Sequence, residues 1–411
     1  MQTSLHQTRI TFNVNLQKIG DEAKLTRVLR AWRPAALLAM NAYNPADGIS
    51  NVGVRLQQVM AEWGGLFIYR LYEPVEARLW AHRSVEQQLN MLAHYNAPAN
   101  VWFNVGNEPV GEGNGAAREA DIRRGADWYA ELFRRAPARG LRISGPALPV
   151  AAFQPHEVQW WDSMLQSLAE HHRYNGEVML ALNTHEYAFA DPRVHCAGRD
   201  PRLLLKKTKE RPPAPTWAEI RRDLNVNYLM FRTEQYLARM SELVGIPVDQ
   251  LGVPVDLTEV MVDRMQNIET GFPDVAAFVD SFDGRKAYGI PTLVNYWQWS
   301  EEKSAGEALC DINAWWEATA PGYYRDACWY SWTTHDEHPH FWRTNFAVQD
   351  QDEWFDKWPA RAASIRRPPV VIPTIPKPTT GRIPGRLLQV PLSYVNVREQ
   401  PTTASKDLGD L

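Results

Sequence analysis

The sequence predicts a (β/α)8 barrel, in which eight parallel strands form a closed ring and a helix follows each strand. Short apolar runs alternate with helical patterns along most of the chain. Because a parallel strand needs a crossover connection to return to the same edge of the sheet, this alternation favours a parallel arrangement. About eight such units over ~250 residues or more close a barrel. The competing open, doubly wound sheet is disfavoured, since no glycine-rich phosphate loop follows the first strand.

The eight strands are expected where β-branched and aromatic residues cluster between turn residues. In chain order, the predicted strands cover residues 10–15, 35–40, 65–72, 101–109, 141–148, 178–187, 252–260 and 326–332. The eighth position is contested, because residues 291–300 (PTLVNYWQWS) also have a strand-like composition. We prefer residues 326–332, because a helix-like stretch, residues 307–318, lies directly before them.

Two of the predicted helices have clear local signals. The helix after the first strand carries four large apolar residues on one face, namely Leu25, Val28, Leu29 and Trp32. Ser84 and Gln87 have the spacing of a capping box, in which each side chain accepts a hydrogen bond from the other residue's backbone N–H. We therefore expect another helix to begin directly after Ser84.

Composition and charge argue against several functional classes. A net charge of −4 gives no electrostatic reason to expect a nucleic acid or an anionic membrane as partner. No run approaches the ~20 apolar residues of a membrane span, and the first 30 residues lack the apolar segment of a signal peptide. The three cysteines (Cys196, Cys310 and Cys328) cannot form a closed disulfide framework. Oligomeric state and localisation stay open.

The stretch 101–109, VWFNVGNEP, combines a buried strand with a carboxylate. Its first residues are β-branched or aromatic, and Pro109 restricts Glu108 to extended backbone and ends the strand. A charge at the end of a buried strand is costly unless it has a function. The structural alternative is an ordinary Asn-Glu-Pro turn.

In a barrel of this kind, functional residues collect at the carboxyl ends of the strands, which together we call the mouth. The polar and aromatic residues at these ends are Asn41, Arg70, Asn107, Glu108, His185, Tyr187, Thr258, Glu259 and Trp332. Glu108 and Glu259 end the fourth and seventh strands, on opposite sides of the mouth. A pair of carboxylates facing each other is what double-displacement glycoside hydrolysis needs, with one acting as acid/base and the other as nucleophile.

Four of these motifs together resemble the retaining β-glycosidases of clan GH-A, over residues 8–364. They are Asn107-Glu108-Pro109, His185-x-Tyr187, Glu259 in DLTEV and Trp332. The resemblance implies that Glu108 is the general acid/base and Glu259 the nucleophile, acting on a β-linked oligo- or polysaccharide without a cofactor. It further implies that Asn107 binds the sugar 2-hydroxyl and that Arg70 pairs with the nucleophile. His185 or Tyr187 would orient the carboxylates, and Trp332 would form the floor of the sugar subsite.

The proposed roles make a geometric demand on the fourth strand. Strict alternation would send Asn107 and Glu108 to opposite faces. Both can face the mouth only if the strand bends or bulges, and Gly106 is where we expect this.

Other readings of these residues stay open. The barrel could be a catalytically inactive carbohydrate-binding or scaffold protein, since fold does not guarantee function. A metal-dependent hydrolase would use the histidine-rich stretch 334–342, whose spacing matches no helical zinc motif. Trp329 is the alternative to Trp332 as the ring that faces the mouth. Core packing is the simpler role for Trp297 and Trp299, and Cys196 lacks a marked partner base.

The chain beyond residue 365 has a different composition. Residues 366–388 are rich in proline and lack an apolar period, which predicts an extended linker after a barrel of residues 1–365. Residues 389–411 resemble the opening of a bacterial SH3-like domain, in Tyr394-Val395-Asn396-Val397-Arg398, Pro401 and Leu408-Gly409. Such a domain implies an extracellular or cell-envelope setting. Some twenty residues cannot bury a core of their own.

Overall fold

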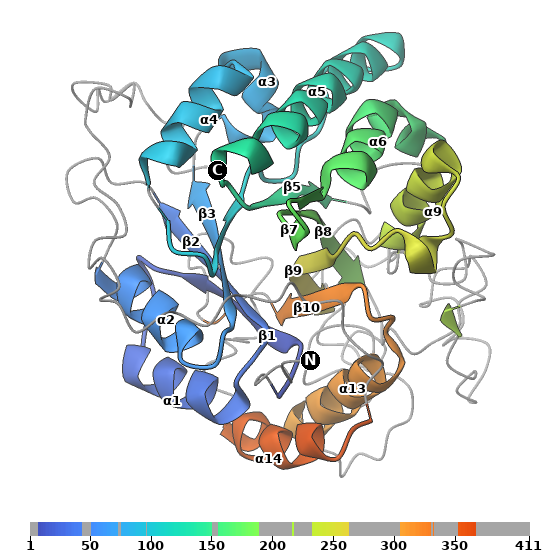
Figure 1. The fold of residues 1–411 in the computed structure, drawn as a ribbon. Coiled ribbons are helices and arrows are strands. Elements are labelled where there is room, and N and C mark those ends of the chain that lie inside the picture. The colour runs from blue at the N-terminus through green and yellow to red at the C-terminus, as the bar shows by residue number, and fades with distance from the viewer. Residues whose placement is uncertain are drawn as a thin grey trace, which may run out of the picture.

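The fold is a closed barrel of eight parallel strands surrounded by helices, as the sequence predicts (Figure 1). The computed structural model describes residues 7–42, 51–72, 75–95, 97–149, 155–188, 216–217, 232–262, 305–329, 332 and 352–366. Around the ring, the strands are β1 (Ile10–Asn15), β2 (Ala36–Ala42), β3 (Leu66–Tyr72), β4 (Val101–Asn104), β5 (Ile143–Pro149), β8 (Leu180–Ala188), β9 (Val255–Val262) and β10 (Tyr324–Trp329). Each barrel strand pairs in parallel with its two neighbours.

The described helices form the outer layer of the barrel (Figure 1). They are α1 (Glu22–Trp32), α2 (Asn51–Ala61), α3 (Leu79–His82), α4 (Val85–His94), α5 (Ala116–Arg135), α6 (Asp162–His171), α9 (Thr233–Val244), α13 (Ala305–Thr319) and α14 (Asp352–Ala363). Short 3-10 segments are η1 (Glu76–Arg78), η2 (Pro137–Arg139), η4 (Pro155–Trp161) and η5 (Val248–Gln250). A small antiparallel hairpin pairs β6 (Arg173–Tyr174) with β7 (Glu177–Val178).

The local sequence signals of two helices are confirmed. Helix α1 buries the four apolar residues of its predicted face. At the start of α4, the Ser84 hydroxyl accepts from Gln87 N at 3.2 Å and the Gln87 side chain accepts from Ser84 N at 2.8 Å. The cap satisfies N–H groups that the first helical turn leaves without partners.

Strand β10 closes the barrel, because it pairs with β9 on one side and β1 on the other. It overlaps the preferred candidate for the eighth strand, residues 326–332, but begins two residues earlier and ends at Trp329, and α13 precedes it as expected. Residues 291–300 lie outside the described residues. A buried ion pair joins the N-terminal part of the barrel to the helix that precedes its last strand. The Arg9 guanidinium pairs with Glu317 of α13 at 3.1 Å, and both side chains are fully buried.

The barrel interior is partly polar. The guanidinium of Arg325 lies 3.8 Å from the ring centroid of Trp102 and donates through Nε to Asp256 Oδ1 at 2.7 Å. Burial, and the charge of the nearby Asp256, raise the pKa of the Asp326 carboxyl well above its ordinary value. A cluster of apolar residues fills the rest of the interior, from Ala36, Leu38, Met40, Leu66, Ile68, Trp102, Val178, Ala181 and Cys328.

In the described part of the chain, no helix combines the length and apolar character needed to cross a membrane. Residues 367–411 lie outside the described residues. The linker and the SH3-like segment therefore stay predictions.

Candidate active site

Glu108 follows β4 on a segment whose backbone is bent as predicted. The strand ends at Asn104, earlier than the stretch to Pro109 that the sequence favours, and Gly106 has a φ of 84°. A positive φ is accessible to glycine at little cost. The segment stays attached to β5, because Glu108 N donates to the Ala147 carbonyl at 2.9 Å. Glu108 itself has a φ of 44°, so the extended backbone expected before Pro109 is wrong. A positive φ is uncommon for a residue with a side chain and often marks a functional position.

This bend lets two consecutive residues reach the same region. The Asn107 amide oxygen accepts from Arg70 Nη1 at 2.5 Å, and the Glu108 carboxylate contacts His185 at 3.0 Å. A regular strand would have directed one of these side chains outward. The predicted bend at Gly106 is therefore confirmed.

Glu259 is buried on β9 and paired with Arg70 from β3. Arg70 Nη1 donates to Glu259 Oε1 at 2.7 Å, and the two side chains are 7% and 5% exposed. Asn13 Nδ2 of β1 donates to the same oxygen at 3.4 Å. Both donors stabilise a carboxylate rather than a carboxylic acid, as a nucleophile requires. The Arg70 side chain is itself held by Asn107 and by the Met40 sulfur.

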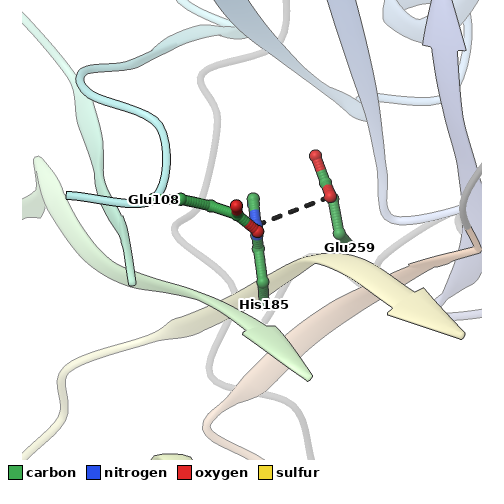
Figure 2. A group of neighbouring side chains, drawn as sticks. All are labelled: Glu108, His185 and Glu259. Carbon is green, nitrogen blue, oxygen red and sulfur yellow. Dashed lines mark hydrogen bonds and ion pairs between the residues drawn. The ribbon is translucent and has the colours of Figure 1, made fainter. Parts of the chain in front are cut away.

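His185 of β8 lies between the two glutamates (Figure 2). Its Nδ1 is 3.0 Å from Glu108 Oε1 and 3.5 Å from Glu259 Oε2, and the ring is fully buried. One oxygen of each glutamate and one ring nitrogen of His185 all lie within 4.8 Å of one another. The site thus brings together two carboxylates from opposite sides of the barrel.

The two carboxylates have different surroundings. The Glu108 side chain is 43% exposed, whereas that of Glu259 is 5% exposed. The Arg70 ion pair is made with Glu259, while Glu108 contacts His185. One carboxylate is therefore open to solvent and the other is fixed against a buried cation, an asymmetry that suits two different chemical roles.

Glu108, His185 and Glu259 also have the composition of a metal site. Imidazole and carboxylate atoms bind zinc at about 2.0–2.2 Å. The guanidinium of Arg70 against Glu259 opposes a second cation by charge repulsion. These contacts favour acid–base chemistry between the three groups.

The prediction that Trp332 forms the floor of the sugar subsite at the mouth is wrong. Strand β10 ends at Trp329, and the Trp332 ring is fully buried, stacked on Phe355 of α14 at 5.4 Å and 5.3 Å from Phe12. The competing Trp329 donates through its ring N–H to Asn313 of α13 at 2.9 Å. Both rings pack into the layer between barrel and helices.

Several other predicted residues cannot be compared. Asn41 and Tyr187 belong to β2 and β8, near the ends of those strands, but their side chains lie outside the described residues. The same holds for Trp297, Trp299, the histidine-rich stretch 334–342 and Cys196.

The sequence interpretation missed Asn13. This residue is fully buried, and its amide contacts Glu259. The signal was a polar residue inside the apolar run ITFNVN, at a position that alternation assigns to the inside of the barrel.

Comparisons with known proteins found remote similarity to solved structures. No family model and no curated protein matches the chain. A glucosidase from Croceicoccus marinus is 10% identical over 87% of this chain, with a TM-score of 0.42, and the match spans 66% of that enzyme. A GH5-4 broad-specificity endoglucanase from Clostridum cellulovorans is 8% identical, with 86% and 94% of the two chains covered and a TM-score of 0.40. A β-mannanase from Thermomonospora fusca is 9% identical, with 87% and 92% covered and a TM-score of 0.36. At these sequence identities and TM-scores, the similarities do not indicate which reaction this protein catalyses.

Proposed function

We propose that this protein is a glycoside hydrolase that cleaves a β-linked oligo- or polysaccharide with retention of anomeric configuration. The observation that carries the proposal is the approach of Glu108 and Glu259, whose nearest ligand atoms lie within 4.8 Å. Retaining glycosidases hold their two carboxyl groups about 5–5.5 Å apart, whereas inverting enzymes need about 6.5–9.5 Å to admit a water molecule. The short separation supports retention.

In the first step, Glu259 attacks the anomeric carbon while Glu108 gives its proton to the departing glycosidic oxygen. The sugar is then bound covalently to Glu259. In the second step, the Glu108 carboxylate takes a proton from water, which attacks the same carbon and releases Glu259. The exposure of Glu108 supports its role as acid/base. The glycosidic oxygen that it protonates in the first step and the water that it deprotonates in the second both lie on the solvent-exposed side of the site.

The neighbouring residues are suited to holding the sugar and the nucleophile. The Asn107 oxygen accepts from Arg70, so its Nδ2 is the atom that would donate to the sugar 2-hydroxyl. Arg70 and Asn13 both donate to Glu259 Oε1 and would orient its carboxylate. His185 contacts both carboxylates and would orient them. Asn41 and Tyr187 remain proposed substrate residues, on the strength of their positions near strand ends.

The division of the chain is part of the same proposal. Residues 1–365 would form the catalytic barrel, residues 366–388 a linker and residues 389–411 the opening of an SH3-like domain. Limited proteolysis tests this: cleavage within residues 366–388 that releases an active barrel supports it, and resistance of that stretch contradicts it.

Turnover of model substrates tests the proposed activity. The protein should be assayed against a panel of aryl β-glycosides and of plant and bacterial polysaccharides. We expect Glu259→Ala to abolish turnover, and added azide to restore aryl release by attacking the anomeric carbon to give the α-glycosyl azide. Glu112→Ala changes an exposed carboxylate further along the loop after β4 and serves as the matched control. Full activity of Glu259→Ala without azide would contradict the assignment.

A further inference from the structure

Strand β9 contains one more residue than its neighbour at the point where it carries Glu259. Leu257 pairs with Thr184 of β8, but the next pair joins Glu259 to His185, so Thr258 is the additional residue. The pairing with β10 is also interrupted there, between Ala327 and Trp329. This is a β-bulge, which redirects the side chains that follow it.

The bulge brings two consecutive side chains to the inside of the barrel. Thr258 Oγ1 donates to Asn183 Oδ1 at 2.5 Å, and Glu259 contacts Arg70. In a regular strand these two residues would face opposite sides. The direction of the Glu259 side chain therefore depends on the conformation at Thr258.

A buried ring of hydrogen bonds holds Thr258 in place. Asn183 Nδ2 of β8 donates to Ser144 Oγ of β5 at 2.9 Å, and Ser144 Oγ donates to Asp256 Oδ2 at 2.5 Å. Asp256 and Thr258 belong to the same strand, so the hydrogen bonds leave β9 on one side of Leu257 and return on the other. All four side chains that form the ring are fully buried.

The direction of each bond in the ring is determined. The Asp256 carboxylate is paired with the Arg325 guanidinium, so it accepts from Ser144. Ser144 Oγ then accepts from the Asn183 NH2 group, which directs Asn183 Oδ1 toward Thr258. An amide oxygen is only an acceptor, and Thr258 must donate. A residue without a hydroxyl at position 258 would leave a buried acceptor without its donor.

We propose that Thr258 is a positioning residue, which fixes the bulge of β9 through the ring with Asn183, Ser144 and Asp256 and so aims the Glu259 carboxylate at the reacting carbon. The inference rests on the proposed function for its kinetic readout. A shift of a reacting group by about 1 Å can lower turnover about a hundredfold. Binding of the sugar depends on many other contacts and would change far less.

Thr258→Val tests the proposal, because valine keeps the branched shape and removes the hydroxyl. We expect kcat on the best aryl β-glycoside to fall at least about tenfold with KM within about threefold, and Thr258→Ser to retain kcat within about threefold. Thr11→Val is the matched control: Thr11 is a fully buried threonine of β1 whose hydroxyl has no hydrogen-bond partner among the described residues. It should leave kcat and KM unchanged.

A second readout does not depend on turnover. The NMR resonance of His185 Nδ1, 3.5 Å from Glu259 Oε2, should move in Thr258→Val and stay in place in Thr11→Val. If Thr258→Val does not fold, Ser144→Ala opens the ring at a different bond and should lower kcat in the same direction. Normal kcat with an unmoved His185 resonance, in whichever variant folds, would overturn the proposal. If the native protein cleaves no glycoside, the proposed function fails, and the His185 resonance alone decides whether Thr258 positions Glu259.

Discussion

Arg70 Nη1 lies 2.7 Å from Glu259 Oε1, and the two side chains are almost completely buried. The arginine comes from β3 and the glutamate from β9, so the ion pair spans the barrel. Removing one partner of such a pair leaves an uncompensated buried charge, which costs more than the pair itself contributes. The pair therefore couples the integrity of the site to that of the fold.

Arg70→Met should destabilise the protein and inactivate it. We expect the free energy of unfolding in urea to fall by about 3–5 kcal/mol, since Glu259 loses its buried partner, and kcat to fall at least about a hundredfold. Arg30→Met removes an exposed arginine that pairs with Glu62 and is the matched control. An exposed pair contributes little, so the control should resemble the native protein. Equal unfolding midpoints for the two variants would contradict this account of Arg70.

Glu108→Gln should separate substrates by their leaving groups. Departure of a dinitrophenolate needs no proton, whereas departure of an alcohol or sugar does. We expect the first step to persist for dinitrophenyl glycosides, and hydrolysis of unactivated glycosides to fall by about 10²–10⁴-fold. Pre-steady-state aryl release measures the first step. A uniform loss on both kinds of substrate would argue against an acid/base role, and Glu112→Gln should change neither.

Metal chemistry makes the opposite prediction to the proposed mechanism. If Glu108 is the acid/base, Glu259 the nucleophile and His185 the residue that orients them, dialysis against EDTA leaves activity intact. Added Zn²⁺ should inhibit, because the ion would compete for the same three groups. Activity lost on chelation and restored by a divalent ion would favour the metal-dependent hydrolase.

Asp121 of α5, which accepts from the backbone of Glu112 in the loop after β4, should make the stability of the protein depend on pH. Burial raises the pKa of its carboxyl, but donors from Arg78, Arg124, Trp80 and the backbone of Glu112 outweigh burial and hold it well below its usual range. A lowered folded-state pKa stabilises the protein above the unfolded-state value, near 3.9, and that contribution is lost as the pH falls further.

Asp121→Asn should therefore lower the free energy of unfolding by about 1.5–3 kcal/mol at pH 7, the range for hydrogen bonds to charged groups. The difference from the native protein should shrink below about pH 4, where the Asp121 carboxyl of the unfolded chain begins to take up protons while that of the folded chain stays ionised. Urea unfolding between pH 3 and pH 7 measures both effects. A difference that does not vary with pH would show that the charge of Asp121 is not responsible.

The barrel could be predicted from the sequence because its signals are local. Apolar runs and helical periodicity locate each of the eight strands within a few residues, and the Ser84–Gln87 cap gives the start of α4. The bend at Gly106 followed from a conflict between alternation and the expected roles of Asn107 and Glu108.

The features that were predicted wrongly or not at all depend on strand register and on residues distant in the sequence. Trp332 was expected at the mouth, but the rings of Phe12 and Phe355 provide an apolar layer that buries it. The bulge at Thr258 depends on how β9 pairs with β8, and the DLTEV sequence does not specify that pairing. Asn13 becomes relevant only once the ring closes and β1 approaches Glu259.

Covalent trapping of the nucleophile tests the central claim most directly. A 2-deoxy-2-fluoro β-glycoside with a dinitrophenyl leaving group, matched to the sugar that the panel identifies, should inactivate the protein by forming a stable glycosyl ester. Mass spectrometry of the digested protein should find the added fluorosugar on Glu259. A label on another residue, or turnover whose first-formed product has the inverted configuration, would contradict the account.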